Sequence, residues 1–240
     1  MSYADNPYQS WGLVAADATA DERAGFIRKT YAHLAGAVLA FIALEAVLLN
    51  LPGLDNLMMR MSETRWGWLL VMGGFVLVAT VADSWARNAT SLATQYAGLA
   101  LYVVAEAVIF VPLLWVASRF AGPEVIPTAG LLTAIVFCGL TAIVFVTGAD
   151  FSWLRTALMV AGLASIGLIV CSIIFGFNLG IVFSAAMIVL ASGYILYDTS
   201  NVLHHYRIGQ HVAAALALFA AVALLFWYML RLVMALQSRD

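Results

Sequence analysis

Seven long apolar runs, separated by short polar stretches, most constrain what this chain can fold into. The runs span residues 31–51, 66–82, 96–116, 126–146, 156–175, 179–197 and 212–236. Each is close to the ~20 residues that an α-helix needs to cross a hydrocarbon layer of ~30 Å. The runs are apolar on all sides, whereas the strands of a membrane barrel alternate. The sequence therefore predicts an all-α membrane protein with seven transmembrane helices.

The composition agrees with this fold class. Hydrophobic residues make up 64% of the 240 residues and charged residues 10%, against about 25% charged in soluble domains. The net charge of −2 argues against a nucleic-acid-binding protein. We divide the chain into a polar tail, residues 1–25, and a membrane domain, residues 26–240. The tail has no basic start followed by an apolar core, so we expect the first run to direct insertion.

The loop charges favour one orientation. With the tail in the cytoplasm, six basic residues lie on the inner side: Arg23, Arg28, Lys29, Arg87, Arg155 and Arg207. Four lie on the outer side: Arg60, Arg65, Arg119 and Arg239. Positive residues concentrate on the cytoplasmic side of membrane proteins. We therefore expect a cytoplasmic N-terminus and, with seven helices, a C-terminus on the opposite side.

Three charged residues lie within the apolar runs, where an ionised side chain costs about 2.5–3.5 kcal/mol. Glu106 lies in the middle of the third run, Glu45 two-thirds along the first, and Arg231 near the end of the last. Glu45 and Arg231 fall in the same half of the layer. The sequence leaves two interpretations open for them: an ion pair, or an arginine that extends its head to the membrane surface.

Three aspartates follow runs that end on the inner side: Asp83, Asp150 and Asp198. Aspartates at helix ends often only cap the helix. If the sixth helix continues past residue 197, however, one face carries four polar residues at helical spacing: Tyr194, Asp198, Asn201 and His205. A polar stripe that starts within the apolar layer is expected at a water-lined mouth, so Asp198, Asn201 and His205 are candidates for an ion pathway or pH sensor, together with Glu106.

The remaining motifs predict neither a metal site nor an enzyme. His204 and His205 are neighbours, which point apart on a helix, and His211 follows nearby. We expect these histidines to lie in a wet loop and to titrate near neutral pH. The sequence shows no nucleophile–base pair, no H-E-x-x-H and no phosphate-binding glycine loop. We therefore predict no cofactor.

Three stretches carry a resemblance over residues 22–236. They are "FIRKTYAHLAGAVLA", "LLTAIVFCGLTAIVFVTGADFSWL" and "GFNLGIVFSAAMIVLASGYILYDTSNVLHH". The sequence resembles the Bax inhibitor-1 family, in its bacterial YccA-like branch, to which "DTSNVLHH" is most similar. The resemblance implies a seven-helix bundle with one helix at its centre. For a bacterial protein we expect the inner membrane, and the orientation that the loop charges favour then places the C-terminus in the periplasm.

The resemblance implies two functional themes. YccA-like members bind and modulate the membrane AAA+ protease FtsH, in association with HflK and HflC. Other members are pH-sensitive leaks for calcium ions, in which two carboxyls on the last two helices share a proton. The first carboxyl of that pair maps onto Asp198, but the second maps onto Ala221 within "LFAAVALLF", so the pair is incomplete. A basic latch of the family maps onto Arg87.

We therefore expect a membrane-embedded modulator that binds an FtsH-type protease and restrains the degradation of membrane proteins. The alternative is a leak for calcium ions or protons that works without the second carboxyl.

Overall fold

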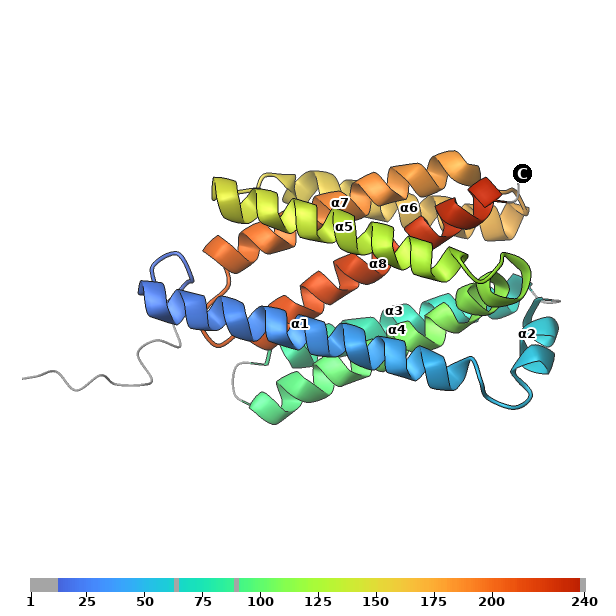
Figure 1. Cartoon of the computed structure of the whole chain (residues 1–240), viewed down its shortest axis with the longest axis horizontal. Helices are drawn as coiled ribbons and strands as arrows, with labels where there is room; N and C mark the ends of the chain where they lie inside the picture. The colour runs from blue at the N-terminus through green and yellow to red at the C-terminus, as the bar shows by residue number, and fades with distance from the viewer. Residues whose placement is uncertain (1–12, 63–64, 89–90, 238–240) are drawn as a thin grey trace, which may run out of the picture.

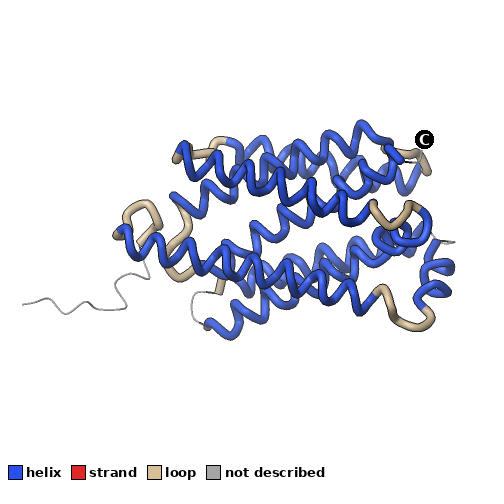
Figure 2. Tube along the Cα trace, in the orientation of Figure 1, coloured by secondary structure: helices blue, strands red, loops and turns tan. Residues whose placement is uncertain are grey.

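The computed structural model describes residues 13–62, 65–88 and 91–237, and this part of the chain is built from helices. Figures 1 and 2 show them as long rods that run roughly side by side. Their bounds are α1 (Ala20–Leu48), α2 (Leu54–Ser62), α3 (Arg65–Ala86), α4 (Leu92–Phe120), α5 (Val125–Thr147), α6 (Leu154–Phe175), α7 (Gly180–His204) and α8 (His211–Gln237). Seven of these helices, all except α2, are long and apolar enough to cross a membrane, which confirms the predicted fold class.

The helices extend beyond the apolar runs because their ends carry polar residues. α1 begins at Ala20, eleven positions before the run from which it was predicted. Thr19 caps it: the Glu22 backbone N–H donates to the Thr19 hydroxyl, and the Glu22 carboxylate accepts from the Thr19 backbone N–H. This reciprocal pair satisfies two backbone donors at a helix start. The end of the segment that we assigned to the tail is therefore helical.

The short helix α2 was not predicted. Leu54 and Met58 lie on its buried face, against Val111 of α4. The carboxylate of Asp55 also binds α4: it accepts from the Trp115 indole N–H at 2.6 Å and from Arg119 at 3.3 Å. The apolar spacing of 54, 57, 58 and 61 is typical of an amphipathic helix. It lies in a stretch that hydropathy alone marks as a loop.

Helix α8 lies at the centre of the bundle. In Figure 1 it crosses between two groups of helices, with α1, α3 and α4 below it and α5, α6 and α7 above. It packs against α1, α3, α4, α5 and α7. Of its apolar window 67% is buried, against 6% for α6, which lies at the periphery. The structure thus identifies the central helix that the family resemblance implied.

Aromatic rings fill the middle of the bundle around α8. Phe219 of α8 lies 6.1 Å from Phe41 of α1, centroid to centroid. Phe110 of α4 lies 5.0 Å from the same Phe41. It also lies 5.7 Å from Phe226 and 4.9 Å from Trp227, about two turns after Phe219 on α8. Such ring pairs add to the stabilisation from burial alone. The centre of the bundle is therefore filled by apolar side chains.

One end of the bundle is closed by the segment before α1. We call this end the N-side; α1, α4, α6 and α8 begin there, and α3, α5 and α7 end there (Figure 1). Residues 13–17, the N-terminal strap, lie against the loop between α7 and α8. The Ala15 N–H donates to the Tyr206 carbonyl at 2.8 Å, and the Ile208 N–H donates to the Leu13 carbonyl at 2.9 Å. Ala15 is 0% exposed, so the strap belongs to the folded body.

Candidate functional site

The candidate site is the end of α7 on the N-side, where the polar stripe lies. α7 continues to His204, so Tyr194, Asp198, Asn201 and His205 do fall along one face. The Tyr194 hydroxyl donates to the Leu158 carbonyl of α6 at 3.0 Å. The stripe therefore faces α6, the loop before it and the end of α3.

Asp198 lies within a group of four polar side chains. It is partly buried, and the charges that act on it are those of Arg87 and Asp83 at the end of α3. Arg87 donates from Nε to both oxygens of Asp83, at 3.0 Å and 2.8 Å, and also hydrogen-bonds Tyr206. This contact with Asp83 raises the pKa of Arg87. Burial, and then the charge of Asp198, raises the pKa of Tyr206 in the loop after α7.

The structure thus places the predicted latch residue Arg87 next to Asp198. Arg87 forms an ion pair at 2.8 Å with Asp83, four residues earlier in the chain. Asp83 lies at the end of α3, and its charge also acts on Asp198. Ala221 is buried on α8.

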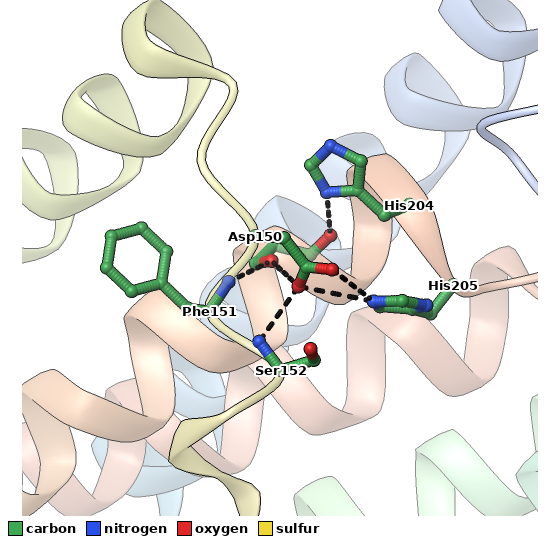
Figure 3. Close-up of polar contacts among 6 residues, drawn as sticks. Asp150, Phe151, Ser152, His204 and His205 are labelled. Carbon is green, nitrogen blue, oxygen red and sulfur yellow. Dashed lines mark hydrogen bonds and ion pairs between the residues drawn. The ribbon is translucent and has the colours of Figure 1, made fainter.

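A second group of contacts holds the α5–α6 loop to the end of α7 (Figure 3). Asp150 accepts from His205 Nε2 at 3.1 Å and 3.2 Å and from the Ser152 backbone N–H at 2.8 Å. Ser200 donates to Asp150 at 3.3 Å and accepts the Phe151 N–H at 2.9 Å. The Ser152 N–H, followed by His205, lowers the pKa of Asp150 to about 2. This carboxylate therefore stays charged at any physiological pH.

The residues around Asp150 were missed by reasoning from the sequence. Asp150 was treated as a possible helix cap, and Ser200 was not singled out. The available signal was the stretch "TGADFSW", which lies in one of the three segments that carry the family resemblance. Nothing in that stretch identifies His205, which is 55 positions away, as the partner.

The three histidines do not form one site. His204 ends α7, and its Nδ1 lies 3.0 Å from the Ser200 carbonyl. His205 points to Asp150 instead (Figure 3). His211 begins α8 and is only 9% exposed, with its ring 4.9 Å from that of His33. The expectation of three wet, loop-borne histidines was wrong for His211, because α8 starts one residue earlier than the apolar run and carries it into the bundle. Within the described residues, no group of three or more His, Cys, Asp or Glu could hold a metal ion.

Glu106 lies deeper, in the middle of α4. It is 7% exposed and accepts a hydrogen bond from Tyr102, one turn closer to the N-side. The charges that act on Tyr102 are those of Glu106 and Asp83. Tyr102 and Glu106 are therefore joined by a hydrogen bond, and the charge of Asp83 acts on both Tyr102 and Asp198. Glu106 lies one helical turn before Phe110.

Glu45 and Arg231 do not pair across the described part of the structure. Both carboxylate oxygens of Glu45 are buried and lack a hydrogen-bond partner there. The Arg231 guanidinium instead lies 6.0 Å from the centre of the Tyr228 ring, on its own helix. Glu45 is one turn past Phe41, whereas Arg231 is three turns past Phe219, the ring that Phe41 meets. The two charges therefore lie at different depths.

The fold and this site define a class: a seven-helix integral membrane protein, organised around an apolar central helix, with a carboxylate and arginine group at one end. The sequence profile of the family described as inhibitor of apoptosis-promoting Bax1 matches residues 23–239. The chain therefore belongs to the Bax inhibitor-1 family.

Individual relatives are similar over most of their length. An uncharacterized protein of Pseudomonas aeruginosa is 28% identical over 228 residues, covering 93% of this chain and 95% of that protein. Bax inhibitor 1 of Schizosaccharomyces pombe is 28% identical over 223 residues, covering 91% and 79%. Protein LIFEGUARD 3 of Arabidopsis thaliana is 26% identical over 220 residues, covering 90% and 86%.

Proposed function

We propose that the protein is a YccA-like membrane modulator that binds an FtsH-type AAA+ protease complex, with HflK and HflC, and restrains the degradation of membrane proteins. The observation that carries this proposal is the central helix. From Val212 to Leu230, α8 contains no Asp, Glu, Lys, Arg or His. Its rings pack with those of α1 and α4 across the centre of the bundle. Such a core supports a binding function rather than a continuous path for ions.

The proposal includes an orientation. The N-side is cytoplasmic in a bacterial inner membrane, and the C-terminus of α8 is periplasmic. The six basic residues assigned to the inner side support this, since cytoplasmic loops carry an excess of Lys and Arg. The ATPase domains of a membrane AAA+ protease would then face the N-side, including Asp150, His205 and the N-terminal strap.

The proposed point of engagement is the polar tail, residues 1–25, with one refinement from the fold. Ala15 and Thr19 are part of the folded body, since one packs in the core and the other caps α1. A protease that pulls on the chain would therefore grip residues before 13. A deletion that tests this must end at residue 12, because a longer one would also destabilise α1.

The experiment is a pulse-chase of the parent and the variant lacking residues 2–12, in cells with and without the protease. We expect the deletion to lengthen the lifetime of the protein only where the protease is present. A pull-down in parallel should recover the protease with both chains, because the helices provide most of the surface for contact. Equal lifetimes in all four cases, with no protease recovered, would reject the proposal.

The alternative function, a leak for calcium ions or protons, is favoured by the polar residues of α3, α4 and α7, namely Asp83, Tyr102, Glu106 and Asp198. An ion that passes Glu106 would have to displace the packed rings of Phe110, Phe226 and Trp227. Ala221→Asp would restore the second carboxyl on α8, and Ala221→Asn is the matched control of similar shape without charge. If the leak exists, flux into dye-loaded vesicles should become more pH-dependent in the Asp variant than in the Asn variant. A strong acid-dependent flux in the parent would favour the leak over the modulator and would point to Asp83 or Glu106 as the second carboxyl.

A further inference from the structure

We propose that a cavity on the N-side binds the phosphate group of an anionic ligand, with Lys29 as its main contact. The cavity has a volume of about 340 Å³ and lies between the first turns of α1, the start of α4 and the loop before α8. Its lining includes Glu22 and Lys29 from α1, Leu92 from α4, and His211. It is separate from the group around Asp198 and from Asp150.

The walls of the cavity are held in place by the fold. Ile208 and Gly209 form one wall, and the Ile208 N–H is bound to the strap through the Leu13 carbonyl at 2.9 Å. Gly209 turns the chain into α8 with φ of 102°, a conformation that favours glycine. Phe26, at the base of the cavity, is 3% exposed. The site is thus preformed, which reduces the entropy lost when a ligand binds.

The two charged side chains of the lining are not equivalent. The Glu22 carboxylate already accepts from the backbone N–H and the hydroxyl of Thr19, at 3.1 Å and 2.9 Å. Lys29 is exposed, and its ammonium makes no ion pair with any carboxylate in the described ranges. The cavity therefore offers one cation with unused donors. Its anion is already engaged with the helix cap.

The two neighbouring histidines, His33 and His211, leave Lys29 as the cation of the cavity. His33 Nδ1 lies 2.6 Å from the Lys29 carbonyl, which only accepts, so this nitrogen carries the proton. Its Nε2 then accepts from the Tyr96 hydroxyl at 3.1 Å, which satisfies the neutral ring. His211 packs against His33 and lines the cavity. The ring of His211 already hydrogen-bonds the Gly209 backbone. The ammonium of Lys29 is the kind of donor from which phosphate oxygens accept.

Two sources could supply such a phosphate. One is the headgroup of an anionic phospholipid, because the first turns of a membrane-spanning helix lie at headgroup depth. The other is a free phosphate compound from the aqueous side. Both sources would bring a phosphate group to the Lys29 ammonium. The experiment below distinguishes them by comparing a phospholipid with inorganic phosphate.

The test measures ligand binding to the full-length protein in a non-ionic detergent, by titration calorimetry. The probes are short-chain phosphatidylglycerol, the matching diacylglycerol without phosphate, and inorganic phosphate. The variants are Lys29→Ala, Lys29→Arg and the control Arg28→Ala, which removes an exposed basic neighbour that does not line the cavity. Unchanged thermal unfolding shows that each variant folds.

We expect phosphatidylglycerol to bind and diacylglycerol not to bind. Lys29→Ala should weaken binding about tenfold or more, as expected for the loss of a charge-assisted hydrogen bond. Lys29→Arg and Arg28→Ala should bind like the parent. If inorganic phosphate competes with phosphatidylglycerol, the source is a free phosphate compound. If it does not compete, the source is the lipid headgroup. No binding of either phosphate probe, equal binding of diacylglycerol, or equal weakening by Arg28→Ala and Lys29→Ala would overturn the proposal.

Discussion

Replacing Gly98 by alanine should move the helix end that carries Asp83 and Arg87. Gly98 of α4 lies where α3 approaches most closely. A Cβ atom placed on it would be 2.5 Å from the Ala86 backbone N and 2.6 Å from the Ala82 carbonyl oxygen. Ordinary contacts of a Cβ begin at 3.4 Å. The two backbones must therefore separate by most of an ångström, because neither atom belongs to a side chain that can rotate away.

Overpacking of this kind costs about 1–3 kcal/mol. The gain in helix propensity from glycine to alanine, about 1 kcal/mol, offsets only part of it. We therefore expect Gly98→Ala to lower the midpoint of thermal unfolding in detergent by several degrees. The matched control is Gly36→Ala in α1, where no atom lies within 4 Å of the new Cβ, so the midpoint should stay or rise. If Gly98→Ala is as stable as Gly36→Ala, the close approach of α3 and α4 is incorrect.

Three further predictions concern the contacts that hold loops and ends to the bundle. Asp150→Asn should lower stability by less than about 1 kcal/mol, because the side chains of His205 and Asp150 are 47% and 45% exposed. The backbone N–H of Ser152, and then His205, hold the pKa of Asp150 at about 2, which is below the unfolded value of about 4. The carboxylate therefore stabilises the fold above about pH 4, and this stabilisation is lost as the pH falls towards 2. The unfolding curves of parent and variant should therefore still differ at pH 5 as they do at pH 7, and a difference that vanishes by pH 5 would contradict this cause. Ala15→Asp should destabilise the strap by about 2 kcal/mol or more, because it buries an unpaired charge in the core, and limited proteolysis should then cleave before α1; unchanged resistance would show that the strap is not held there. Asp55→Ala should speed amide hydrogen exchange in α2 without affecting α4, because α2 loses the bond to Trp115; equal exchange would mean that the apolar face alone holds α2.

The sequence was sufficient for the seven membrane helices and for the polar face of α7. Both depend on local information, namely the length of an apolar run and the helical spacing of Tyr194, Asp198, Asn201 and His205. The exact helix ends were harder to predict, since residues such as Thr19 and Glu22 are polar and yet cap or begin a helix. Hydropathy cannot distinguish such residues from those of a loop.

Only the tertiary structure decided which helix is central. The apolar windows of α6 and α8 have mean hydropathies of 2.6 and 2.3, yet α6 is 6% buried and α8 67%. Lipid and protein interior are equally apolar, so a side chain that faces either one looks the same in the sequence. The partners of the charged groups were likewise decided by packing. His205 meets Asp150 and Arg87 approaches Asp198 because α3, α7 and the α5–α6 loop end at the same side of the bundle, and no spacing along the chain encodes that meeting.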